Sequence, residues 1–273
     1  MTFNIRGYWH PGDGVNQWHH REALNVLTIR RSAPHLIGLQ EAQGRNLKAY
    51  KKLLPEYWYT EGPQYGNRPP HEWNAVFWDP QQLQPTDSGG FWLSETPERN
   101  SRSWDTDNIR SAAWVKFRCA ESGARFVHLN THLDHVSEDA RINGSKLIIE
   151  RLGELQRDGC AAIVTGDFNA PPRSPTYELY TDAGFADTFI AAGNSDDDPR
   201  ESYTNHGWRG YPWDRAGDKP QRIDWILVRD GAQASVFAKA CRIVRDAEPP
   251  VYPSDHYPIV AEVEITRSSA ARQ

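Results

Sequence analysis

Apolar residues along the chain fall into short runs that alternate with longer amphipathic stretches, a pattern typical of strands alternating with helices. Residues 17–32 place apolar side chains at helical spacing and finish on two arginines, which predicts a helix with a basic last turn. The aliphatic run 35–41 predicts a buried strand that ends on an acidic residue. Further strands are expected at 2–6, 74–78, 89–94, 111–119 and 124–133.

The second half of the chain predicts two more helices before it returns to strands. The longest helical pattern runs from Ser137, a suitable N-cap, to Gly159, a suitable exit residue. A shorter helix is expected to follow Ser174, which is succeeded by a proline. Strands are expected at 160–169, 222–228, 234–244 and 258–265, and the last has one apolar and one acidic face. Because strands outnumber helices, we expect an α/β fold with two packed mixed sheets flanked by helices, a four-layer sandwich.

Composition narrows the class of protein. With no linker-like stretch between its patterned segments, the 273-residue chain is expected to be a single domain over residues 1–273, and a monomer. The net charge of −5 leaves nucleic acid possible as a partner but does not favour it, because no basic field is present to bind phosphates.

Cysteine usage and hydropathy bear on location. Three scattered cysteines indicate neither a disulfide framework nor a CxxC metal site, which suits the cytoplasm. No apolar run approaches the roughly 20 residues that span a bilayer, so no membrane partner is expected. No signal peptide precedes Phe3, and secretion stays open if a leader has been removed.

Polar residues gather where the apolar strands end. One such cluster can be ordinary turn chemistry, because Asp and Asn side chains bond nearby backbone groups. Several clusters together indicate one pocket, since ligands bind at strand ends in α/β proteins. The clusters are Asn4; Gln40 and Glu41; Asn130, His132, Asp134 and His135; Asp167 and Asn169; and Asp224, Asp255 and His256.

These residue types suit metal-assisted hydrolysis of a phosphate ester. Glu41 and Asp255 can bind a hard divalent ion such as Mg²⁺ or Mn²⁺, and Asn4 can add a carbonyl oxygen or orient a metal-bound water. Asp167 and Asn169 can activate and position an attacking water. In addition, His256 can contact the phosphate, with Asp224 available to orient its ring.

The motifs "FNIR", "IGLQE", "NTHLDH", "GDFN", "RIDWI" and "SDHYP", in this order, resemble the endonuclease/exonuclease/phosphatase superfamily over nearly the whole chain. The resemblance implies a four-layer α/β sandwich and a metal-dependent phosphoesterase. It also implies Glu41 as the principal metal ligand with Asn4 and Asp255 nearby, Asp167 as the water-activating residue, and Asn169 as its partner.

The same resemblance implies that His256 binds the scissile phosphate and that Asp224 holds it. His132 stands where apurinic endonucleases carry Tyr, and Arg6 stands where they have an acid beside the metal. Both departures lower the expectation of abasic-site repair. A His at this position instead resembles the deadenylase, sphingomyelinase and small-phosphodiesterase branches of the superfamily.

The candidate substrate-binding residues can be interpreted either as substrate contacts or as structural residues. Arg110 can clamp a phosphate or pair with a nearby acid. Asn130 and His135 are candidate substrate-binding residues, although His135 and Asp134 can also simply form the turn before the next helix. Trp208 and Trp213 can stack on a base or sugar, or pin a long loop. The remaining histidines, among them His10, His19, His20, His71 and His206, are expected at the surface rather than as ligands.

The sequence therefore predicts a divalent-metal-dependent phosphoesterase that cleaves a phosphodiester by in-line attack of an Asp-activated water. A nuclease acting on single-stranded RNA or DNA is one alternative, and a small or lipid-linked phosphodiester or a sugar phosphate is another candidate substrate. A third alternative, from a different class of function, is a phosphate-ligand binding module that keeps the fold and has lost catalysis.

Overall fold

A computed structural model describes residues 1–214 and 220–268 of the chain. Two six-stranded sheets dominate the fold. The first sheet has the order β14 (Ala234–Ile243), β15 (Ile259–Arg267), β1 (Thr2–Asn4), β2 (Leu36–Gln40), β7 (Val76–Trp78) and β4 (Trp58–Thr60). The second sheet has the order β12 (Ala186–Asp187), β13 (Asp224–Arg229), β11 (Ala161–Asp167), β10 (Arg125–His132), β9 (Ser111–Cys119) and β8 (Leu83–Trp92).

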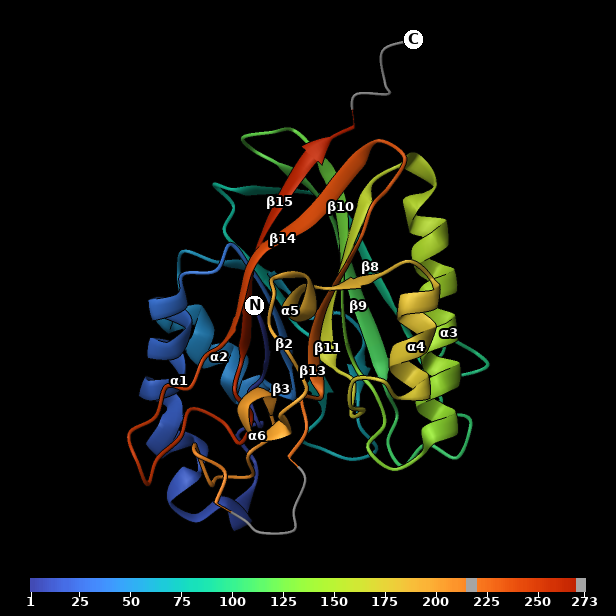
Figure 1. Ribbon diagram of the computed structural model, residues 1–273. Helices are drawn as coiled ribbons and strands as arrows, with labels where there is room; N and C mark the ends of the chain where they lie inside the picture. The colour runs from blue at the N-terminus through green and yellow to red at the C-terminus, as the bar shows by residue number, and fades with distance from the viewer. Residues whose placement is uncertain (215–219, 269–273) are drawn as a thin grey trace.

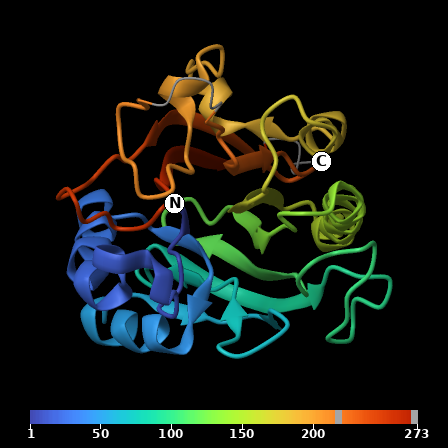
Figure 2. The same ribbon diagram turned by 90° about the horizontal axis from the view of Figure 1, so that it is seen from below.

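Helices cover the outer face of each sheet (Figures 1 and 2). On the first sheet these are α1 (Trp18–Ser32) and α2 (Gly44–Leu53), and on the second they are α3 (Glu138–Leu155) and α4 (Pro175–Asp182). The expected four-layer sandwich of two mixed sheets is therefore confirmed. Smaller elements are η1 (Pro11–Asn16), η2 (Gln156–Asp158), α5 (Thr188–Ala191), α6 (Pro199–Ser202) and a minor sheet of β3 (Ala42–Gln43), β6 (Glu72–Trp73) and β5 (Gln64–Tyr65).

The helix boundaries follow from local capping. The side chain of Ser137 accepts a hydrogen bond from the Ala140 N–H, and that of Ser174 accepts one from the Tyr177 N–H, as an N-cap does. Both predicted caps are confirmed. Helix α2 was not predicted, and strand β8 begins at Leu83, six residues before the strand expected at 89–94. No helix in the described part of the chain is long and apolar enough to cross a membrane.

The space between the two sheets is apolar toward one end and polar toward the other. The apolar part includes Phe117, Phe126 and Ile163 of the second sheet and Ile259 of the first. Toward the other end, the side chain of Asn130 connects the two sheets. Its Nδ2 donates to the backbone oxygens of Leu39 and Ala75, and its Oδ1 accepts from Gln40 and Thr165.

The polar part of this interface also holds His128, which is fully buried. Its Nε2 lies 2.8 Å from Thr165 Oγ1, and its Nδ1 has no hydrogen-bond partner. Burial therefore lowers the pKa of His128 to about 3, and the nearby chain amino group adds to the effect. The imidazole is neutral in the folded protein at neutral pH.

We expect acid to destabilise the fold through His128. Its folded pKa lies below the ordinary value of 6.5, so below pH 6.5 the unfolded chain binds a proton that the folded chain excludes. Lowering the pH from 7.5 to 5.5 should cost about 1 kcal/mol through this group. Urea unfolding of wild type and His128→Gln at both pH values measures this, and the variant should lose that part of the pH dependence. The exposed His19→Gln is the control; equal pH dependence in all three proteins would contradict the expectation.

Asn130→Ala should lower the free energy of unfolding by about 2 to 4 kcal/mol, because it leaves buried hydrogen-bonding groups on both sheets without a partner. Chemical denaturation measures the loss. The exposed Asn100→Ala serves as its control and should stay within about 0.5 kcal/mol of wild type. A stable Asn130→Ala protein with a raised KM would instead support the substrate-binding role predicted for this residue.

Candidate functional site

The candidate site lies where strands of both sheets end or begin. Asn4 ends β1 and Glu41 follows β2 in the first sheet, while His132 and Asp167 end β10 and β11 in the second. Since β1 pairs in parallel with β2, and β10 with β11, these residues reach the same end of the sandwich. Two more residues arrive from the opposite chain direction: Asp224 begins β13, and His256 precedes β15.

Asp167 is the central side chain of this group. Asn4 Nδ2 donates a 2.9 Å hydrogen bond to Asp167 Oδ2, which joins the two sheets. The same oxygen lies 3.4 Å from His132 Nε2 and 3.9 Å from His256 Nε2. The Asn169 N–H donates to the other carboxylate oxygen at 3.0 Å.

The surroundings of Asp167 favour its protonated form more than water does. The residue is 1 % exposed. Burial, together with the neighbouring Asp224 carboxylate, raises the pKa of Asp167 to about 7, while His256 and Asn4 act in the opposite direction. A carboxyl group with this pKa can accept and release a proton near neutral pH.

His256 is held by a carboxylate on its other side. Its Nδ1 lies 2.9 Å from Asp224 Oδ2, and both side chains are buried. Burial alone would lower the pKa of His256, but Asp224 and then Asp167 outweigh it and raise the pKa to about 10. The ring is therefore an imidazolium with its orientation fixed. Asn205 Nδ2 lies 3.1 Å from His256 Nε2.

His132 differs from His256 in charge. Burial, and then the positive charge of Arg110, hold the pKa of His132 well below its usual range, so this ring is neutral. The Tyr65 hydroxyl lies 3.4 Å from His132 Nδ1 and accepts a 2.8 Å hydrogen bond from the Glu41 N–H. Tyr65 thus links Glu41 to His132.

Glu41 occupies a backbone conformation with φ of 58°, which turns the chain sharply after β2. Its Oε1 accepts a 2.9 Å hydrogen bond from Asn4, and its Oε2 lies 3.6 Å from His10 Nε2. Burial raises the pKa of this carboxyl, but Arg6 and His10 outweigh burial and the net pKa is lowered. Glu72 stands beside it, and burial with the charge of Glu41 raises the pKa of Glu72 to about 7.

The donor atoms of this end of the molecule fit a divalent cation. His10, Glu41 and Glu72 each offer one ligand atom, and these atoms lie within 4.8 Å of one another. The buried Nε2 of His10 has no hydrogen-bond partner. Carboxylate oxygens suit Mg²⁺ or Mn²⁺, and an added imidazole nitrogen suits a transition ion.

A second group with the same spacing consists of Asp167, Asp224 and His256. Asp255, expected near the metal, belongs to neither group. Its Oδ2 faces Arg6 Nε at 3.7 Å, and Arg6 also pairs with Asp13. In this arrangement the Asp255 carboxylate is engaged by a cation of the chain itself.

The predicted substrate-binding residues divide into two sets. Arg110 is buried, lies over the ring of Tyr65, and has its Nη2 3.2 Å from the half-exposed His135. Its Nε is 3.8 Å from Asp134, which accepts N–H groups of Val136 and Ser137 and so forms the turn before α3. These residues lie beside the site, next to Tyr65.

The other three predicted contacts lie elsewhere or are engaged. Asn130 is two residues deeper in β10 than His132, with its amide committed to inter-sheet hydrogen bonds. Trp208 packs against the Arg21 guanidinium, and Trp213 packs edge-on against Tyr203. Both contacts agree with the alternative in which the tryptophans pin their loop.

Several residues of the site were not singled out from the sequence. Tyr65, Glu72 and Asn205 lie in short strands or loops without a strong periodic pattern. The expectation that His206 is exposed was wrong: it is 1 % exposed and stacks on Tyr257 with 4.2 Å between ring centroids. His10 was expected at the surface and is half-buried beside Glu41.

Comparison with known proteins identifies the family. The sequence model of the endonuclease/exonuclease/phosphatase family matches residues 1–256. No curated protein sequence matches the chain. An endonuclease/exonuclease/phosphatase structure from Bacteroides vulgatus is 31% identical with a TM-score of 0.83, covering 96% of this chain and 97% of that one.

Two further structures are similar. A mannosyl-6-phosphatase from Bacteroides thetaiotaomicron is 27% identical with a TM-score of 0.84, covering 96% of this chain and 98% of that one. The human nocturnin catalytic domain shares the fold at 21% identity, with a TM-score of 0.73 over 97% of this chain and 92% of that one. The chain belongs to the endonuclease/exonuclease/phosphatase family, whose members hydrolyse phosphate esters.

Proposed function

We propose that this protein is a divalent-metal-dependent phosphoesterase that cleaves phosphodiesters by attack of a water activated by Asp167. The observation that carries the proposal is the position of Asp167, whose Oδ2 lies near Asn4, His132 and His256 at one end of the sandwich. A buried carboxyl with a pKa of about 7 between two imidazoles is suited to proton transfer near neutral pH.

Each side chain then has a separate role. Asp167 takes a proton from water as the new P–O bond forms and the bond to the leaving oxygen breaks; that oxygen then takes a proton from solvent. The imidazolium of His256 donates a hydrogen bond to a phosphate oxygen, and Asp224 keeps the ring in place. Asn169, anchored through Nδ2 to the Leu133 oxygen at 3.0 Å, positions the water.

Glu41 would be the principal ligand of the cation, with His10 and Glu72 beside it and Asn4 fixing the orientation of its carboxylate. A bound Mg²⁺ or Mn²⁺ supplies Lewis-acid polarisation of the phosphate. Neutral His132, linked through Tyr65 to Glu41, keeps the two halves of the site in contact.

The charges around the site favour a singly charged phosphate, which a diester carries, over the dianion of a monoester. Three cations near the site already face carboxylates: Arg6 faces Asp255, Arg110 faces Asp134, and His256 faces Asp224. Apart from the proposed divalent cation, these paired side chains offer little further positive charge to balance a dianion.

A sugar-phosphate monoester is the second candidate substrate. The observation that favours it is the similarity to a mannosyl-6-phosphatase along nearly the full length of both chains. A nuclease is less favoured because the chain carries a net charge of −5, whereas binding of nucleic acid strengthens with each lysine or arginine that neutralises a phosphate.

Asp167→Ala and His256→Ala should each lower kcat for bis-p-nitrophenyl phosphate by about 10² to 10⁴-fold, because one removes the base and the other a hydrogen-bond donor to the phosphate. Steady-state assays with Mn²⁺ measure this, and circular dichroism verifies folding. The exposed Asp182→Ala and His20→Ala are matched controls that should keep wild-type rates. Substantial activity in either purified site variant would overturn the assignment.

A substrate panel separates the remaining candidates. We expect hydrolysis of small phosphodiesters with Mg²⁺ or Mn²⁺ and none with EDTA, and slower turnover of mannose 6-phosphate, single-stranded RNA and single-stranded DNA. Released phosphate or alcohol is measured for each. Preference for mannose 6-phosphate would establish the monoester candidate, and preference for RNA or DNA would establish the nuclease.

The panel also tests the binding-module alternative. Calorimetric titration with Mn²⁺ should give saturable binding that Glu41→Gln weakens. Absence of both metal binding at millimolar concentration and turnover of every panel compound would favour a module without catalysis.

A further inference from the structure

The segment 203–207 is fixed beside the Asp224–His256 pair of the candidate site. The Thr204 hydroxyl accepts a 3.3 Å hydrogen bond from the Asp224 N–H. The backbone oxygen of Thr204 accepts a 2.8 Å hydrogen bond from the Tyr257 N–H. All of these residues except those at the end of the segment are buried. The segment is therefore held against both members of the pair.

Asn205 stands directly opposite His256 in this arrangement. The two residues form an isolated antiparallel bridge. Backbone hydrogen bonds flank the bridge on both sides, among them the 2.9 Å bond from the His206 N–H to the Asp255 oxygen. Opposed residues flanked in this way are the closely spaced kind, and their side chains lie on the same face. The backbone thus places the Asn205 side chain beside the His256 ring.

The two side chains are within hydrogen-bond distance of each other. Asn205 is half-buried, and its amide lies 3.1 Å from His256 Nε2. The other ring nitrogen is engaged by Asp224. Asp167 Oδ2 lies 3.9 Å from Nε2, which is too far for a hydrogen bond. Of these neighbours, the Asn205 amide is therefore the one that bonds to Nε2.

A side-chain amide can act as acceptor and donor at this position. Both ring nitrogens of an imidazolium are donors, so the His256 Nε2–H needs an acceptor. The nearest amide atom is Nδ2, and turning the amide by about 180° exchanges it for Oδ1 without changing the shape of the side chain. A phosphate oxygen that accepts the same proton replaces Oδ1 and comes within reach of Nδ2. The amide then donates a second hydrogen bond to the phosphate.

A neutral donor suits the phosphate of a diester. Arg6 and Arg110, the cations near the site besides His256, already face carboxylates. An amide adds a hydrogen bond to the phosphate without adding a charge. That combination matches the single negative charge of a diester.

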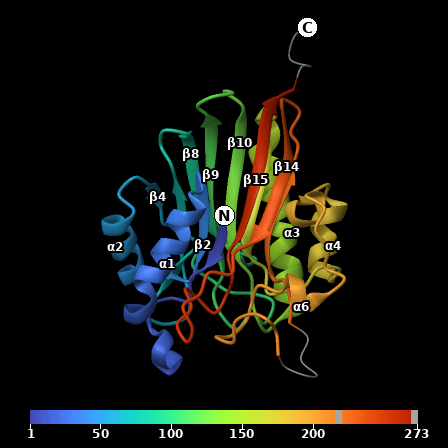
Figure 3. The same ribbon diagram turned by 60° about the vertical axis from the view of Figure 1, so that its left-hand side comes forward.

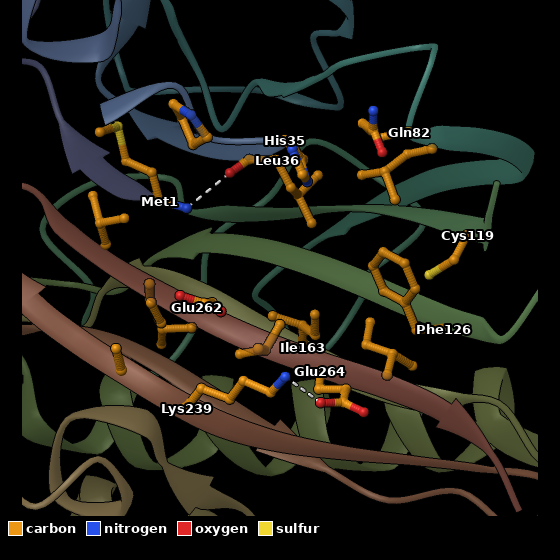
Figure 4. Close-up of a pocket in the computed structure, with 18 of the residues that line it drawn as sticks. Met1, His35, Leu36, Gln82, Cys119, Phe126, Ile163, Lys239, Glu262 and Glu264 are labelled. Carbon is orange, nitrogen blue, oxygen red and sulfur yellow. Dashed lines mark hydrogen bonds and ion pairs between the residues drawn. The ribbon is translucent and has the colours of Figure 1, made fainter. Parts of the chain in front are cut away.

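The contact between Asn205 and His256 lies away from the cavity in Figure 4. That cavity has a volume of about 980 Å³, and His35, Phe126 and Lys239 are among the residues that line it. Neither Asn205 nor His256 is among its described lining residues. Figure 3 shows α6, which ends just before the segment 203–207, at the opposite end of the sandwich from the arrowhead of β15. A ligand in that cavity would not touch Asn205.

We propose that Asn205 is a substrate-binding residue, whose side-chain amide donates a hydrogen bond to the phosphate oxygen that His256 also binds. In the free protein the amide oxygen accepts the His256 Nε2–H instead. This inference rests on the proposed function, because it takes His256 as the residue that contacts the phosphate.

Two substitutions test the contact in the intact protein. Asn205→Ala removes the donor, and KM for bis-p-nitrophenyl phosphate with Mn²⁺ should rise about tenfold while kcat falls less. Asn205→Asp keeps the size but places a carboxylate on the His256 Nε2–H, and KM should rise about a hundredfold. Asn100→Ala and Asn100→Asp, at an exposed residue, are the matched controls and should keep wild-type values. Thermal melting verifies that each variant is folded.

Two further measurements do not depend on turnover. Calorimetric titration with dimethyl phosphate, a singly charged diester, should show saturable binding in the presence of Mg²⁺, weakened about tenfold in Asn205→Ala. NMR of the histidine rings should show the His256 Nε2–H in wild type. In Asn205→Ala this proton should exchange faster with water, because its acceptor has been removed.

The outcomes separate this contact from the proposed function. Wild-type protein that hydrolyses no diester, yet binds dimethyl phosphate more tightly than Asn205→Ala, would support the contact and contradict the catalytic assignment. Hydrolysis with unchanged KM and unchanged dimethyl phosphate affinity in both Asn205 variants would overturn the contact alone. Absence of dimethyl phosphate binding to wild type at millimolar concentration would also overturn it. A lower kcat with unchanged KM in Asn205→Ala would overturn it as well, because Asn205 would then only position His256.

Discussion

The hydrogen bonds of Asn4 hold the two sheets together at the end where the candidate site lies. Its Nδ2 donates to Glu41, just past the end of β2 in the first sheet, and to Asp167 of the second sheet, each at 2.9 Å. The buried carboxylate of Asp167 and the half-buried carboxylate of Glu41, placed this close together, would repel each other and lose hydration. A shared amide donor offsets part of that cost, but only if β1 and β11 end at the same level. The remaining geometry of the site depends on that alignment.

Deeper between the sheets, the same alignment is supported by polar pairs instead of apolar packing. Gln40 and Thr165 both donate to Asn130 Oδ1, at 2.7 and 3.0 Å. Apolar contacts tolerate sliding, whereas hydrogen bonds of this kind fit in one register. His128, neutral and bonded to Thr165, extends the polar column toward the apolar part of the interface. Hydrogen bonds therefore position the two sheets near the candidate site, and burial of apolar side chains holds them together farther from it.

The position of polar residues at the ends of apolar strands explains which parts of the site could be predicted from the sequence. Asp167 and Asp224 stand directly at the end and start of apolar strands, so their position follows from pattern alone. Asn130 has the same parity in β10 as His132 but lies one pleat deeper, and a pattern of alternation cannot separate rim from interior. Glu72 lies in a two-residue strand, which has no detectable period.

Helix α2 was not predicted because its start lacks the usual sequence signal. It begins at Gly44, and its capping box is formed by Gln43 and Asn46 instead of the usual Ser or Thr. The alternation of β15 fixes which residues face inward, and the predicted shared face of Ile259, Ala261, Val263 and Ile265 is confirmed by their packing in one cluster. Whether a neighbouring strand covers them depends on pairing between distant segments.

Charge balance gives a reason for a cation at this end of the molecule. Asp167, Asp224 and His256 form a buried group in which two carboxylates face one imidazolium, so one negative charge is left when Asp167 is ionised. Burial of Asp167, and then the charge of Asp224, raise the pKa of Asp167, because protonation removes a buried negative charge. A divalent cation nearby would remove it equally well, and would leave Asp167 ionised and able to accept a proton from water. The same charge imbalance thus favours both a nearby cation and the base that the proposed hydrolysis needs.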